Sequence, residues 1–234
     1  MPAHPASAIA TSAAPASWVR WNVSDVARSL APEPARKRAR HAARAVLSGL
    51  QAMAAAGHTP VSALIDEAVP SALRQYPQAA PVTGRGFLYY YHCHDARETP
   101  PGEHGHFHVF ARNADGSHTH LVGIAVDASG WPLRLFTTNR WVTDETMAPA
   151  GRVLTLAGQV ACRRHRDALS RWLLAQMDLF HPQLEAVLRR RDARLRALRR
   201  GRQRGRLLED RRIRVLSQCR ISLPAQVAAL DRVA

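Results

Sequence analysis

The sequence predicts an α+β fold, in which a meander of at least four antiparallel strands follows N-terminal helices and precedes a long basic helical region. Apolar residues recur at helical spacing before residue 57 and again beyond residue 143. Between residues 86 and 142 the period changes to two, and short glycine-containing turns separate the strand-like segments. Fourteen arginines lie between positions 189 and 220. We expect one face of the sheet to pack on the helices.

In chain order we expect four segments, with one globular domain from residue 18 to about residue 200. They are a disordered lead-in (1–17), an N-terminal helical segment (18–80), a His-rich antiparallel sheet (81–147) and an Arg-rich C-terminal helical region (148–234). The lead-in lacks the basic start of a secretory signal. No apolar run approaches the roughly 18 residues of a membrane span. Three scattered cysteines argue against a disulfide framework. We therefore expect a cytoplasmic protein without a membrane segment.

Two helices are expected in the N-terminal segment. The first covers residues 35–56, where apolar residues recur at helical spacing and Gly57 supplies the end. The second runs from Pro60 to Ala68 and has Thr59 as its N-cap.

The C-terminal region contains two apolar stripes of helical period, at residues 169–180 and 184–198, with Pro182 between them. Residues 213–216 fit either a strand or a helix, and Ser222 is expected to cap a terminal helix.

Four strands are expected at residues 87–94, 104–113, 117–127 and 131–142. The last three are joined by two loops of three residues, which pair Asn113 with Ser117 and Asp127 with Trp131. This register places one set, polar except for Phe136, on a single face: His104, His106, His108, Arg112, His118, His120, Arg134, Phe136, Thr138 and Arg140. It places an apolar set on the other: Phe107, Val109, Ala111, Leu121, Ala125, Leu133 and Leu135.

The density of histidine in these strands predicts a transition-metal site. Seven of the twelve histidines lie between positions 92 and 120, and imidazoles on adjacent strands can converge on one ion of zinc, iron or copper. The candidate ligands are His92, His94, His106, His108 and His120. His106, His108 and His120 lead, because the loop after His94 leaves the register of the first strand open.

Other residue types near the histidines suggest roles in chemistry. Glu103 is the best carboxylate for a fourth ligand or a general base, and His104 and His118 are candidates for proton transfer. A small polar or anionic substrate is expected to contact Tyr90, Arg112, Thr138 and Arg140. Two alternatives remain open: a metal-free pocket in which neutral histidines bind a ligand, and a half-exposed face that merely tolerates them.

Net charge suggests a different class of function. The formal charge is +15, and residues 189–220 contain only three acidic residues, so the chain could bind nucleic acid through this region with the histidine face incidental. Because only one of the 33 basic residues is lysine, the arginine content also fits the codon bias of a GC-rich genome.

Three blocks carry a resemblance: YYYHCH at residues 89–94, EHGHFH at 103–108 and FTTNRWVT at 136–143. They are similar to the hallmark blocks of an uncharacterised bacterial protein family of unknown function, which implies no activity. The paired His-x-His strands also resemble those of cupins, but no glutamate follows His108 in the cupin position, so this similarity is confined to a few strands.

Overall fold

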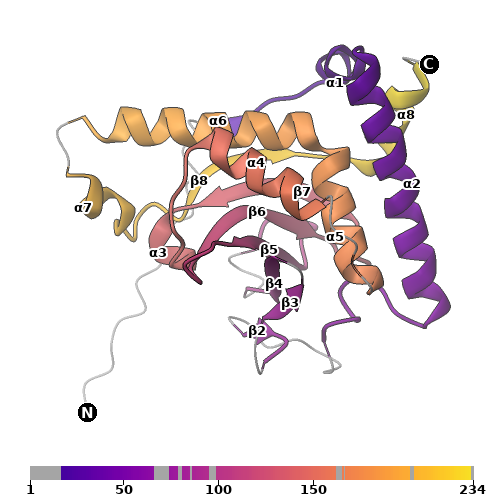
Figure 1. Cartoon of the computed structure of the whole chain (residues 1–234), viewed down its shortest axis with the longest axis horizontal. Helices are drawn as coiled ribbons and strands as arrows, with labels where there is room; N and C mark the ends of the chain where they lie inside the picture. Colours follow the sequence, from indigo (N-terminus) through magenta and orange to yellow (C-terminus); the bar gives the residue numbers. More distant parts are fainter. Residues whose placement is uncertain are drawn as a thin grey trace.

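The computed structural model of the chain describes residues 17–65, 74–78, 81–84, 86–94, 99–161, 165, 167–200 and 203–232. It confirms the α+β class, with one mostly antiparallel sheet and helices packed on it (Figure 1). Of the expected lead-in, residues 1–16 lie outside the described residues. Ser17 is buried and its hydroxyl accepts a hydrogen bond from Gln218 at 3.0 Å.

The sheet has strand order β1-β8-β7-β6-β5-β4-β2, and β3 also pairs with β4. The strands are β1 (Trp18–Val19), β2 (Gln75–Tyr76), β3 (Val82–Gly84), β4 (Phe87–His92), β5 (Gly105–Arg112), β6 (His118–Val126), β7 (Pro132–Thr138) and β8 (Val215–Arg220). The helices are α1 (Val23–Leu30), α2 (Glu33–Ala55), α3 (Arg140–Thr143), α4 (Ala150–Ala161), α5 (Ala168–Leu179), α6 (His181–Leu198), α7 (Arg204–Leu208) and α8 (Leu223–Arg232).

Helices α4, α5 and α6 pack on one face of the sheet, and α2 packs on α5 from outside (Figure 1). The core between them is apolar: the ring of Phe107 on β5 meets that of Trp172 on α5 with centroids 5.9 Å apart. Gly49 lets α2 approach α5 closely, because a Cβ there would lie only 3.0 Å from the Cβ of Trp172. None of the helices in the described ranges combines the length and apolarity needed to cross a bilayer.

The N-terminal helices are only partly as expected. Helix α2 confirms the one predicted at residues 35–56, and Gly57 follows it with φ +78°. The helix expected from Pro60 is wrong over residues 60–64, which form turns, and residues 66–68 lie outside the described residues. Thr59 does cap this turn, since its hydroxyl accepts a hydrogen bond from the Ser62 amide at 3.0 Å. Helix α1 was not expected.

The C-terminal region contributes a strand as well as helices. Helices α5 and α6 correspond to the two stripes around Pro182. Residues 215–220 form β8, which lies between β1 and β7. Of residues 213–216, for which strand and helix were both left open, 215 and 216 are in this strand and 213 and 214 precede it. Helix α8 begins after Ser222, whose hydroxyl accepts a hydrogen bond from the Ala225 amide at 3.3 Å.

Both expected three-residue loops are present. The Asn113 amide donates to the Ser117 carbonyl at 2.8 Å, and the Asp127 amide donates to the Trp131 carbonyl at 3.0 Å. Gly116 and Gly130 have φ of +83° and +85°, the left-handed conformation that such loops require of their last residue.

The register departs from expectation at a β-bulge in β6. His120 pairs with Phe110 as expected, but Val122 pairs with Val109, so Leu121 is an extra residue. An extra residue reverses the alternation of side chains beyond it. Val122 therefore joins the apolar core, and Ala125, expected there, pairs with His106 on the opposite face.

The last expected strand is too long at its C-terminal end. β7 ends at Thr138, and residues 140–143 form the short helix α3. The side chain of Asn139 accepts a hydrogen bond from the Arg140 amide at 3.1 Å and so caps this helix. Arg140 consequently does not share the alternation of β7.

Candidate metal centre

The face of the sheet opposite the helices carries a row of imidazoles, which we call the histidine row: His92, His94, His106, His108 and His120. Successive ring centroids lie 4.5 Å apart for His92 and His94, and 5.1 Å for His94 and His106. The row continues at 4.8 Å from His106 to His108 and 5.0 Å from His108 to His120. The expectation that these side chains gather on one face therefore matches the structure.

Strand pairing explains how the first histidines join the row. His92 lies directly opposite His106 in the antiparallel pair β4–β5, and Tyr90 lies opposite His108. His94 follows the end of β4, and its ring returns to within 5.1 Å of the His106 ring. The register that the sequence left open thus brings His92 and His94 beside His106.

His92, His94 and His106 form a cluster that could hold a metal ion, which we call the triad. One ring nitrogen from each lies within 4.8 Å of the others, and His106 is buried while the other two are half-buried. In a tetrahedral site with bonds of 2.0–2.1 Å, ligand atoms are about 3.3 Å apart, so small side-chain rotations would complete the geometry. Within the described ranges this is the one group of three or more His, Cys, Asp or Glu residues with such geometry.

The protonation state of the cluster also suits a metal. Burial lowers the pKa of His106 well below its usual value, and the neighbouring His92 and His94 lower it further. The pKa of His94 is lowered by burial and by the charge of Arg214. Since a metal binds the neutral imidazole, His94 and His106 are already in the form that binds metal near pH 7.

His108 and His120, expected as leading ligands, bond to each other instead. His108 Nδ1 lies 3.1 Å from His120 Nε2, a buried hydrogen bond in which one ring carries the proton. The β-bulge places Gly123, not a bulky residue, opposite His108. The ring of Phe136 fills the space beside Gly123. A Cβ atom at position 123 would lie only 2.3 Å from Cζ of Phe136.

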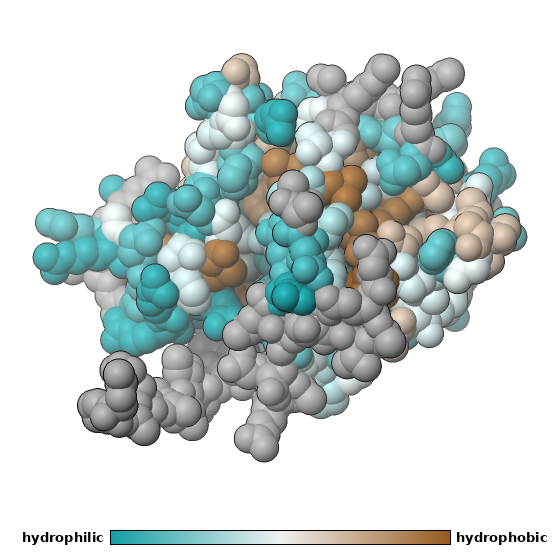
Figure 2. Space-filling model, turned by 90° about the horizontal axis from the view of Figure 1, so that it is seen from below, coloured by the Kyte–Doolittle hydropathy of each residue, from teal (hydrophilic) through white to brown (hydrophobic). Residues whose placement is uncertain are grey.

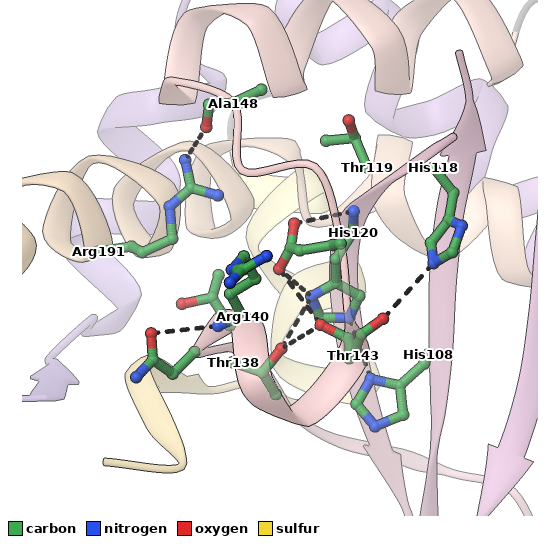
Figure 3. A network of polar contacts seen from close by, with 12 residues as sticks. His108, His118, Thr119, His120, Thr138, Arg140, Thr143, Ala148 and Arg191 are labelled. Carbon is green, nitrogen blue, oxygen red and sulfur yellow. Dashed lines mark hydrogen bonds and ion pairs between the residues drawn. The ribbon is translucent and has the colours of Figure 1, made fainter. Parts of the chain in front are cut away.

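Beyond His120 the row continues into a buried polar network (Figure 3). Thr138 Oγ1 lies 3.3 Å from His120 Nδ1, and Glu145 Oε1 lies 3.9 Å from the same nitrogen. The other carboxylate oxygen of Glu145 accepts a hydrogen bond from the backbone amide of His120 at 3.0 Å. Thr143 donates its hydroxyl to Glu145 at 3.4 Å. Thr138, expected on the same face as His120, thus contacts it, whereas Glu145 was not predicted.

Glu145 reaches His120 because β7 leaves β6 there. The β6–β7 pairing covers Gly123 to Val126, so residues 118–120 have no partner strand on that side. The segment after α3 takes this place: the Thr146 amide donates to the His118 carbonyl at 2.8 Å. The carboxylate of Glu145 then replaces the strand carbonyl that the His120 amide would otherwise bind.

Burial shifts the pKa values of both Glu145 and His120. It raises the pKa of Glu145 to about 7, although the Arg191 charge, the His120 amide and the Thr143 hydroxyl oppose the rise. It lowers the pKa of His120 to about 3, and the Arg191 charge adds to the effect. Near pH 7 His120 is therefore neutral, while the Glu145 carboxyl can gain or lose a proton.

Comparison of the sequence with known protein families identifies the family of this chain. A family model described as Domain of unknown function (DUF6969) matches residues 40–221. The chain belongs to this family. The match spans the histidine row and Glu145, and it confirms the expected membership of an uncharacterised family. No curated protein and no solved structure matches the chain.

Glu103, the expected fourth ligand or base, forms a buried ion pair with Arg134. The two carboxylate oxygens accept from Arg134 Nε and Nη2 at 2.6 and 2.8 Å. Arg134 Nη1 also donates to Gln218 at 2.8 Å, and the guanidinium lies 4.7 Å above the Phe136 ring. Binding a metal through Glu103 would leave a buried guanidinium without its partner, which is costly.

The two histidines expected to transfer protons lie apart from the triad. His104 Nδ1 is 2.6 Å from the hydroxyl of Tyr91, whose ring belongs to the apolar core, so His104 does not share the histidine face. His118 packs its ring against Phe110 at 5.1 Å, and its Nε2 lies 3.5 Å from the Thr143 carbonyl.

The residues expected to bind substrate are dispersed. The ring of Tyr90 packs against that of His108 in a tilted arrangement with centroids 5.1 Å apart, and burial raises the pKa of Tyr90 to about 12. Arg112 is exposed at the end of β5. Arg140 Nη2 pairs with Glu209 at 2.5 Å. Only Tyr90 and Thr138 of this set contact the histidine row directly.

Proposed function

We propose that the protein binds one transition-metal ion, zinc, iron or copper, through His92, His94 and His106. The observation that carries the proposal is that one ring nitrogen of each residue lies within 4.8 Å of the others. An all-imidazole set suits these metals. Three protein ligands also leave a coordination position open, as in catalytic rather than structural sites.

We further propose that the open position takes a small polar or anionic ligand. When bound, the metal would supply Lewis-acid chemistry, by polarising a ligand oxygen or activating water. The positive charge of Arg214, which lowers the pKa of His94, favours an anion on this side of the row. The Tyr90 hydroxyl, with its pKa raised to about 12, remains protonated and can donate a hydrogen bond.

The rest of the histidine row suits the movement of a proton. His108 and His120 share a hydrogen bond between ring nitrogens, so each can hold the proton when the other accepts. Glu145 lies at the far side of His120 and has a pKa of about 7, close to the value at which a carboxyl exchanges protons best near neutrality. The His108 ring lies next to the triad, with its centroid 4.8 Å from that of His106.

Zinc titration of the metal-free protein, followed by calorimetry, tests the ligand assignment. The wild type is expected to bind about one equivalent, and the His94→Ala/His106→Ala variant is expected to bind at least about 100-fold more weakly, since even outer partners of a metal contribute 10- to 100-fold. His118→Ala is the matched control, because it removes a histidine of the same face that lies outside the triad. Unchanged affinity in the double variant, with a native circular dichroism spectrum, would refute the assignment.

The open position can be probed with azide, a small anion. In the cobalt-substituted protein, azide is expected to change the visible absorption spectrum, because it enters the coordination sphere. A cobalt spectrum that saturating azide leaves unchanged would show a closed site, and would contradict the second part of the proposal without touching the first.

A further inference from the structure

The arginine-rich end of the molecule, residues 194–200 and 203–214, is a second feature that the metal site does not explain. It comprises the last turns of α6, helix α7 and the segment leading to β8, and it projects beyond the sheet (Figure 1). Figure 2 shows hydrophilic residues at this same end of the molecule. Seven exposed arginines lie on it: Arg196, Arg199, Arg200, Arg206, Arg211, Arg212 and Arg214.

The acidic residues near this end are already engaged. Glu209 pairs with Arg140 at 2.5 Å, and Asp210 pairs with Arg212 at 2.8 Å. Asp192 accepts from Arg191 and from the Ala150 amide. Four of the exposed arginines pair with no carboxylate of the described residues: Arg196, Arg199, Arg200 and Arg206. The positive charge of this surface is therefore not neutralised locally.

Aromatic contacts fix two further guanidinium groups. Those of Arg211 and Arg214 lie 5.6 and 5.7 Å from the ring centroid of Trp141. The indole of Trp141 donates to the Ile213 carbonyl at 2.9 Å, which ties this ring to the same segment. Cations held in place lose less conformational freedom when they bind an anion.

The chemistry of this surface favours the phosphates of nucleic acid over a membrane. A segment that lies on a membrane inserts apolar side chains, but the large exposed hydrophobic residues of the described ranges are Leu47 and Trp131, both elsewhere. Leu207 and Leu208 of α7 are buried. Guanidinium groups bind phosphate oxygens in pairs and need no apolar anchor.

We propose that the arginine-rich end binds the phosphate backbone of nucleic acid without reading its sequence. Its residues are charged groups spread over a projecting surface. Affinity should therefore come mainly from the release of counterions and depend steeply on salt.

Fluorescence anisotropy of a labelled 20-base-pair duplex of arbitrary sequence, with the full chain, tests this proposal. With about four phosphate contacts, affinity should fall roughly 100-fold between 50 and 200 mM salt. Replacing Arg196, Arg199, Arg200 and Arg206 with Gln should weaken binding at least 10-fold and flatten the salt dependence. The matched control replaces four basic residues on α2 and α4 with Gln: Lys37, Arg40, Arg44 and Arg152. It should stay within about twofold of the wild type.

Two results would overturn the proposal. One is no duplex binding at 50 mM salt, whether or not the protein binds phosphatidylserine vesicles; the other is an equal loss of affinity in the control variant. Equal loss would mean that net charge alone, and not this surface, attracts the duplex. A native circular dichroism spectrum and an unchanged thermal unfolding midpoint of the quadruple Gln variant serve as the folding check, since the four arginines are exposed.

Discussion

Glu145 is a buried polar side chain that contacts the histidine row and yet carries no sequence motif. It lies in the segment after α3, 25 residues from His120, whose amide and ring it contacts. The face of His106, His108 and His120 was predictable, because alternation along strands and the glycine turns determine it, whereas the position of His92 and His94 depends on a register that the sequence left open. Glu145 was not predictable, because its position depends on where β7 leaves β6.

Glu145→Ala is expected to destabilise the protein by about 1–3 kcal/mol, because the buried His120 amide loses its acceptor. Glu145→Gln retains an amide oxygen that can accept this bond and should cost less. Urea unfolding of the two variants measures the difference. Equal losses of stability would mean that the hydrogen bond from the His120 amide to Glu145 does not account for the stabilising effect of this side chain.

The partner of Glu103 is a second contact that the local sequence does not predict. Its role as ligand or base was inferred from its place beside the histidines, but Arg134 lies 31 residues further along the chain and takes both oxygens. A long-range pair of this kind follows from the pairing of β6 with β7, which brings Arg134 opposite Ala125.

At the scale of elements, the hairpin loops were predictable and the bulge was not. A glycine in the last loop position is a strong local signal, as Gly116 and Gly130 show. A bulge adds one residue without a comparable signal, and it shifted Val122 and Ala125 between faces. Gly123 is its only local trace, since an interior glycine often marks a bulge or a close contact.

Gly123→Ala is expected to destabilise the fold by about 1–3 kcal/mol, because the new methyl group would overlap the Phe136 ring. Gly158→Ala is the matched control: it lies in α4 with nothing within 4 Å of the new Cβ. This control should be neutral or stabilising by up to about 1 kcal/mol. Thermal unfolding of the two variants measures the difference. A Gly123→Ala variant as stable as the control would show that the Phe136 ring can move away from position 123.

At the scale of the whole molecule, the first and the last strand of the described chain meet in one sheet. β1 pairs in parallel with β8, and Ser17 accepts from Gln218, 201 residues away. No local pattern predicts a two-residue strand of this kind, which forms because β8 offers a free edge. The general α+β class could be predicted because it depends only on the order and period of the elements.

Stability of the metal-free protein should fall as pH decreases from 7 to 5. The pKa values of His106, His108 and His120 lie below that of an unfolded histidine, about 6.5. The unfolded chain therefore binds more protons below pH 6.5, and the contribution of these neutral side chains is lost as pH falls. Glu145 acts oppositely: with its pKa raised to about 7, it contributes stability at low pH that is lost as pH rises through 7.

Between pH 7 and pH 5 the stability lost through the three histidines exceeds the stability gained through Glu145. The urea midpoint should therefore decrease from pH 7 to pH 5. His108→Gln, which removes one buried imidazole, should show a shallower decrease. A wild-type midpoint that stays constant or rises towards pH 5 would mean that the buried histidines are protonated in the folded protein.

The most direct test of the account is the metal content of untagged protein, purified without chelators or added metal and measured by elemental analysis. The geometry of His92, His94 and His106 predicts about one equivalent of zinc, iron or copper per chain. Protein that contains no transition metal, and takes up none when dialysed against each of these ions, would contradict the central claim.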